Sequence, residues 1–130
     1  MKKQCTNYNI PPELPCCGVA TLCHVLDKNF KEVFLSVKDA YSKGEDWYGG
    51  MTLHQLLLFL IDNSVEFEEL KTKDMTLQEF CSGASGKYVI NTPLHFQFFN
   101  NGKIYDQKGE VEPQNSEYKN EKIINLIKIF

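Results

Sequence analysis

Arginine is absent from this sequence of 130 residues, and all fourteen basic side chains are lysines. Guanidinium groups make the bidentate contacts that read guanine and clamp phosphate, so their absence argues against nucleic-acid recognition. The net charge of −3 and the pI of about 5.6 also exclude a global positive field that would gather phosphate backbones. We therefore expect no nucleic-acid partner.

Long apolar runs are also missing. The longest covers residues 56–61, far short of the roughly 18 residues that a membrane helix needs. The five cysteines are an odd number, and the first residues are too polar for a signal peptide. We expect a cytoplasmic protein without a membrane partner, formed by one domain over residues 1–130. The sequence does not indicate an oligomeric state.

The spacing of apolar residues predicts helices first and strands later. The expected helices cover residues 17–26, 30–43 with Asn29 as N-cap, 53–61 with Thr52 as N-cap, and 77–81 with a capping box of Thr76 and Glu79. The expected strands cover residues 65–69, 88–91, 94–99 and 103–107. The apolar run of residues 123–130 fits a helix or a strand, and its isoleucines favour a strand. This order predicts an α+β domain, with a helical layer packed on a small antiparallel sheet.

Cys17 is the candidate nucleophile. It stands where a proline-containing segment turns into an apolar helix, and Gly18 follows it. Unpaired amides and the helix dipole stabilise an anion at such a position, which predicts a lowered thiol pKa. Gly18 is expected to leave open space beside the sulfur for an attacked carbonyl. The alternative is that Cys17 is a small buried apolar residue, the commonest fate of a free cysteine.

The other cysteines are weaker candidates. Cys16 is adjacent but lacks the following glycine, and we expect its side chain to point elsewhere. Cys23 falls on the apolar stripe in the middle of the helix. Metal binding by the cysteines around His24 is disfavoured, because neither a Cys-x-x-Cys nor a His-x-x-x-His spacing occurs.

Of the three histidines, His95 is the candidate base. His24 shares a helix with Cys17 but lies about 10 Å away along the axis, too far for proton transfer. His54 falls in the first turn of the third expected helix and is interpreted as structural or solvent-facing.

The two strands expected at residues 94–99 and 103–107 form a predicted hairpin, which would place Asp106 beside His95. With Asn101-Gly102 as a type I′ turn, Gln97 falls opposite Asp106. Alternation then puts His95 and Asp106 on one face as diagonal neighbours, where the carboxylate can orient the imidazole. A bulge at the turn would instead send them to opposite faces, and an incidental surface pair is the other interpretation.

Two segments together carry a resemblance to a known family. Residues 15–22, Pro-Cys-Cys-Gly-Val-Ala-Thr-Leu, and residues 94–106, Leu-His-Phe-Gln-Phe-Phe-Asn-Asn-Gly-Lys-Ile-Tyr-Asp, resemble the papain-like cysteine peptidase superfamily. The similarity is greatest to its small bacteriocin-leader-processing and phage-encoded branch. The resemblance implies a catalytic triad of Cys17, His95 and Asp106, a peptide or protein substrate, and no cofactor.

One feature departs from the family. A glutamine about half a dozen residues before the nucleophile usually donates to the oxyanion there, whereas this chain has Pro11 and Pro12. Proline cannot donate, so the oxyanion hole is assigned to the Cys17 amide with Asn9 as a helper.

Three functions therefore stay open. The first is a thiol hydrolase that cleaves peptide or isopeptide bonds. The second is a degenerate relative that binds a peptide or host protein without turnover. The third is amidase, deamidase or transglutaminase chemistry with the same residues.

Overall fold

The computed structural model describes residues 8–130 except positions 12, 14, 48 and 108. Its helices are α2 (Cys17–Leu26), α3 (Phe30–Ala40), α4 (Leu53–Asp62) and α5 (Leu77–Gly83). Its strands are β1 (Phe67–Leu70), β2 (Lys87–Thr92), β3 (His95–Asn100), β4 (Lys103–Asp106), β5 (Gly109–Val111) and β6 (Asn125–Ile129), and a 3₁₀ turn, η1, covers Pro113–Asn115. No helix in the described ranges is long and apolar enough to cross a membrane.

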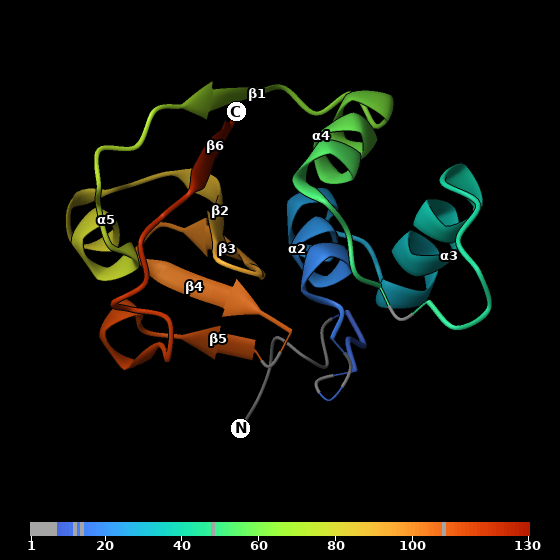
Figure 1. Ribbon diagram of the computed structural model, residues 1–130, viewed down its shortest axis with the longest axis horizontal. Helices are drawn as coiled ribbons and strands as arrows, with labels where there is room; N and C mark the ends of the chain where they lie inside the picture. The colour runs from blue at the N-terminus through green and yellow to red at the C-terminus, as the bar shows by residue number, and fades with distance from the viewer. Residues whose placement is uncertain (1–7, 12, 14, 48, 108) are drawn as a thin grey trace.

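All neighbouring strands run antiparallel in one six-stranded sheet of order β1-β6-β2-β3-β4-β5. The α+β prediction is therefore confirmed. The ambiguous run near the C-terminus forms β6, which lies between β1 and β2 (Figure 1). The β-branched Ile127 and Ile129 are buried there, as suits a paired strand inside the sheet.

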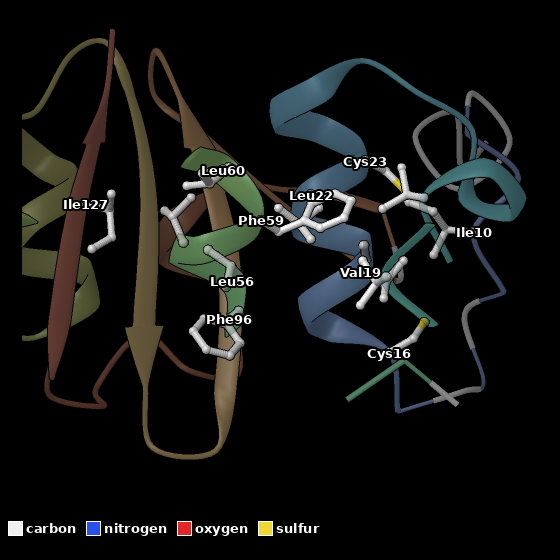
Figure 2. Packing of buried hydrophobic residues seen from close by; sticks show 14 of the residues in the cluster. Ile10, Cys16, Val19, Leu22, Cys23, Leu56, Phe59, Leu60, Phe96 and Ile127 are labelled. Carbon is white, nitrogen blue, oxygen red and sulfur yellow. The ribbon is translucent and has the colours of Figure 1, made fainter. Parts of the chain in front are cut away.

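Helices cover both faces of the sheet, which corrects the expected single helical layer. Helices α2, α3 and α4 lie on one side, and α5 lies on the other (Figure 1). The first core joins α2 and α4 to the sheet through Leu22, Leu60, Phe96 and Ile127 (Figure 2). The second core contains Leu77 and Cys81 of α5 with strand residues of the opposite face. A helix on the second face is needed because successive strand residues, which point to opposite faces, are apolar on both faces.

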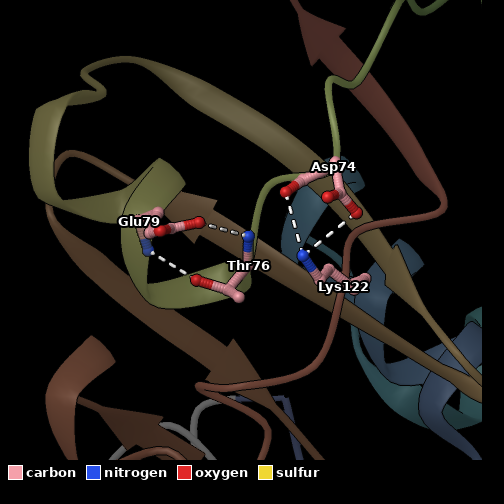
Figure 3. A network of polar contacts seen from close by, with 4 residues as sticks. All are labelled: Asp74, Thr76, Glu79 and Lys122. Carbon is pink, nitrogen blue, oxygen red and sulfur yellow. Dashed lines mark hydrogen bonds and ion pairs between the residues drawn. The ribbon is translucent and has the colours of Figure 1, made fainter.

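Helix α5 begins with the predicted capping box. Thr76 Oγ1 accepts from the Glu79 amide at 3.2 Å, and Glu79 Oε1 accepts from the Thr76 amide at 2.9 Å (Figure 3). These bonds lower the pKa of Glu79, with the amide of Thr76 as the main cause. Beside the cap, Lys122 Nζ lies 3.0 Å from Asp74 Oδ1 and ties the segment before β6 to the start of α5 (Figure 3).

Helix α3 begins at Phe30 with Asn29 as its N-cap, as predicted, but it ends earlier than expected. It stops at Ala40, not at Lys43, because Ser42 adopts a left-handed conformation (φ 52°) and the Lys43 amide bonds back to the carbonyl of Lys38. At the start, Asn29 occupies the N-cap without a capping bond from its side chain. The side chain of Asn29 instead accepts from Asn9.

Candidate active site

The structure brings the three predicted catalytic residues to one cavity of about 550 Å³. Cys17 is the first residue of α2, His95 is the first residue of β3, and Asp106 is the last residue of β4. The cavity thus lies where one helix start and two strand ends converge. The fold therefore brings together three side chains that are far apart in the sequence.

Cys17 and His95 reach the cavity from different faces of the sheet. Phe96 packs in the core on the α2 side and Phe99 in the core on the α5 side, so alternation assigns His95 to the α5 side. Both residues line the cavity, and the β3–β4 ladder ends before it, at the pair Phe98 and Tyr105. Beyond this pair the edge of β3 borders the cavity, and the Phe96 amide interacts with the Cys17 sulfur there.

The hairpin register places His95 and Asp106 on one face as predicted. Asn101 (φ 47°) and Gly102 (φ 95°) both have positive φ, as a type I′ turn requires, and Asn100 pairs with Lys103. The register therefore contains no bulge, and Gln97 falls opposite Asp106. The Nε2 of Gln97 donates to Asp106 Oδ2 at 3.3 Å.

The imidazole of His95 is held by an aromatic ring. The Tyr118 ring stacks on it with a centroid distance of 4.0 Å and an interplanar angle of 12°, and His95 is only 8% exposed. The Tyr118 amide donates to Ser116 Oγ at 3.1 Å, which fixes the turn that carries the ring. Sequence reasoning missed Tyr118, because it follows an irregular segment and no periodic pattern links it to His95.

The pKa of the Cys17 thiol is raised, whereas its position at the start of a helix predicted a lowered pKa. Burial raises the pKa of Cys17 above its ordinary value, although the amides of Phe96, Gly18 and Cys17 itself favour the thiolate. The negative charge of Asp106 raises the pKa further. Desolvation therefore outweighs the helix terminus, and the resting sulfur is a thiol at neutral pH.

This pKa predicts how fast Cys17 reacts with iodoacetamide at different pH. Since the thiolate is the nucleophile, alkylation of Cys17 should be slow at pH 7 and should still increase above pH 9, the ordinary thiol value. The measurement is the alkylation rate of each cysteine by mass spectrometry from pH 6 to 11. Cys23 and Cys81 serve as internal controls, because burial raises the pKa of each to about 12. A Cys17 rate that levels off below pH 8 would contradict the prediction.

Gly18 has a different role from the one expected. It is buried, and a Cβ there would lie 2.9 Å from Cβ of Met51. The space beside Gly18 is thus filled by the Met51 side chain and is not open to a carbonyl. Met51 itself lines the cavity, whereas Trp47 stacks on Phe34. Tyr48, the neighbour of Trp47 in the sequence, lies outside the described residues.

The neighbouring cysteine points away from the cavity, as expected. Cys16 is fully buried in the core of α2 (Figure 2), and its sulfur lies 3.7 Å from the carbonyl oxygen of Pro11. Cys23 is fully buried on the same helix. The four described cysteines form no disulfide. Of these four, Cys17 is the one that lines the cavity.

The other two histidines are kept apart from Cys17. His54 is exposed on α4. His24 lines a separate cavity of about 370 Å³ with Tyr8 and Tyr105, where burial lowers its pKa to about 4. Both positions agree with the exclusion of these residues as the base.

Asn9 is not brought to the candidate site. It is exposed, and its Nδ2 lies 3.5 Å from Oδ1 of Asn29 before α3. It does not line the Cys17 cavity, so the structure offers no support for its role as an oxyanion helper. Of the two prolines that replace the family's glutamine, Pro11 is half-buried and Pro12 lies outside the described residues.

The turn before His95 is strained. Thr92 pairs directly with His95, so Pro93 and Leu94 form a two-residue loop, and the prediction that Leu94 begins the strand is wrong. Leu94 has φ 60° and a fully exposed side chain at the rim of the cavity. A left-handed conformation is unfavourable for a leucine, by about 1 to 2 kcal/mol.

Leu94→Asn is therefore expected to raise the free energy of unfolding by up to about 1 kcal/mol, because asparagine tolerates this backbone conformation. Urea denaturation measures the change. Leu94→Ala is the control, since it removes the same exposed apolar surface but keeps the strain. Equal stability of the two variants would show that the strain is negligible.

Comparisons with known proteins add no further assignment. No family model matches the chain, and no curated protein or solved structure matches it. The assignment of function therefore depends on the sequence and the geometry of the cavity.

Proposed function

We propose that this chain is a papain-like cysteine hydrolase that cleaves peptide or isopeptide bonds. The observation that carries the proposal is the convergence of Cys17, His95 and Asp106 on one cavity of about 550 Å³. A cysteine at a helix start, a histidine on a strand and an aspartate at the end of the next strand occur in the same order in the papain-like family. The α+β fold is compatible with that assignment.

In the proposed reaction the Cys17 sulfur attacks the carbonyl carbon while His95 takes the thiol proton. Because the resting sulfur is protonated, this transfer accompanies the attack and does not precede it as a stable ion pair. The amide of Cys17 donates to the developing oxyanion. His95 then returns the proton to the leaving amine, and a water molecule hydrolyses the thioester.

Asp106 acts on His95 in this scheme. It lies on the same face of the hairpin, where a carboxylate can accept from one ring nitrogen and support the imidazolium that forms. Tyr118, stacked on the ring, restricts the imidazole to one plane. The proton acceptor is thus held by a carboxylate at its side and an aromatic ring on its face.

A proteome-derived peptide library tests the proposal, because it samples many candidate substrates at once. Mass spectrometry should detect new peptide termini after incubation with the wild-type protein. Cys16→Ala is the matched control, since Cys16 is adjacent but buried away from the cavity, and it should produce the same termini. The proposal is wrong if the library, including isopeptide-linked substrates, is left intact by the folded protein.

A second function is favoured by two observations. The raised pKa of Cys17 and the location of Asn9 away from the cavity both fit a relative that binds a peptide without cleaving it. The same library distinguishes the two functions. Peptides that the immobilised protein retains, without any new termini, would favour binding over hydrolysis.

A further inference from the structure

Gln97 is a buried polar residue in the middle of β3. It is 1% exposed, stands between Phe96 and Phe98 in sequence, and pairs with Ile90 of β2. An apolar side chain would suit such a position better, because a buried amide must be hydrogen-bonded to offset its desolvation. Its presence among aromatic and aliphatic neighbours therefore calls for a specific partner.

That partner is the carboxylate of Asp106. The Nε2 of Gln97 donates to Asp106 Oδ2 at 3.3 Å. A carboxylate only accepts, so this contact also fixes which end of the Gln97 amide faces it. The other end, Oε1, is buried without a hydrogen-bond partner in the described part of the chain. The side-chain amide of Gln97 thus has an unsatisfied acceptor, Oε1, while its donor, Nε2, binds Asp106.

The backbone of Asp106 is paired on one side only, with Gly109 of β5, and not toward β3. Asp106 is the last residue of β4, half-buried beside the cavity, and the ladder to β3 has already ended at Tyr105. Gln97 and His95 are two residues apart on β3 and share one face, with Asp106 opposite Gln97 and diagonal to His95. Because the carboxylate group is planar, a hydrogen bond that fixes one of its oxygens also fixes the direction of the other oxygen.

We propose that Gln97 is a positioning residue, whose amide holds Oδ2 of Asp106 so that the other carboxylate oxygen is directed to the His95 ring. This inference rests on the proposed function of the cavity. Gln97 does not line the cavity and touches no reacting atom. It acts through Asp106, in the way that residues behind a catalytic group fix its orientation.

Two variants of nearly equal volume test the role. Gln97→Met removes the donor and the unsatisfied Oε1 together, so the protein should fold as well as the wild type or better. Its kcat on a peptide identified in the library should nevertheless fall about ten- to a hundredfold with little change in KM, because Asp106 loses its orientation.

Gln97→Glu should show a characteristic pH dependence. A protonated carboxyl group at this position donates to Asp106 as the amide does, whereas an ionised one repels it. We expect activity close to that of the wild type at the acidic end of the profile and a steep loss as pH increases. Gln97→Met should show a uniform reduction instead. A merely structural role would give both variants the wild-type pH profile.

The inference is also testable if the chain has no hydrolase activity. Nitrogen-15 NMR of the histidine side chains reports which ring nitrogen of His95 carries the proton, and Gln97→Met should shift that tautomer ratio. A shift in a protein that leaves every peptide intact would support the positioning role and contradict the hydrolase. Wild-type kcat, pH profile and tautomer ratio in both folded variants would overturn the positioning role and leave the hydrolase proposal standing.

Discussion

Cys17→Ala and His95→Ala are each expected to reduce kcat/KM at least about a thousandfold on any peptide that the wild-type protein cleaves. The first variant removes the nucleophile. The second leaves a sulfur whose pKa is raised by burial, with no base to take its proton. Since both act in one step, the double variant should lose little more than either single one.

The measurement is the initial rate of peptide cleavage, with circular dichroism to establish that each variant is folded. Asp106→Asn should also lose activity, because an amide can no longer support the imidazolium. Cys23→Ala is the matched control on the same helix, as it deletes a sulfur that does not reach the cavity. Full activity in Cys17→Ala would end the assignment of the nucleophile.

Gly49→Ala is expected to destabilise the protein by about 3 kcal/mol. Gly49 has φ 112°, a region that side chains rarely adopt, and an added Cβ would lie 2.7 Å from Cβ of Cys16 and 3.2 Å from its Cα. The nearest atoms belong to the backbone and the first side-chain carbon, so they cannot move aside as a flexible side chain would. The substitution must displace either the turn or the start of α2.

Urea denaturation of Gly49→Ala and Gly44→Ala gives a matched comparison. A Cβ added at Gly44 would meet no atom within 4 Å, and Gly44 has no positive φ, so its variant should change the free energy of unfolding by less than about 0.5 kcal/mol. Equal stability of the two variants would contradict the close packing. Because Cys16 precedes the candidate nucleophile, Gly49→Ala should also impair cleavage beyond its effect on the folded fraction.

Local signals predicted the elements that carry the site. The apolar spacing of residues 17–26 and the Asn-Gly turn at 101–102 determine α2 and the β3–β4 register, because both depend on residues close in sequence. The common face of His95 and Asp106 followed from the turn and its register alone. The structure adds the cavity on which they converge with Cys17.

Features that depend on distant packing were missed or misjudged. Tyr118 reaches His95 from an irregular segment, and β5 is too short for a detectable alternation. Gly18 was expected to face open space, but the side chain of Met51, from another part of the chain, fills it. The thiol pKa was misjudged for the same reason, because the helix start is visible in the sequence and the burial of Cys17 is not.

The position of β6 between β1 and β2 affects the order of folding. Strands β1 and β2 both pair with this strand, so residues 67–70 and 87–92 cannot join into one sheet until residues 125–129 insert between them. Until then each presents unpaired amides and carbonyls to other chains. Contacts between residues so far apart in sequence also form slowly. Low protein concentration during refolding should therefore favour the native state over aggregates.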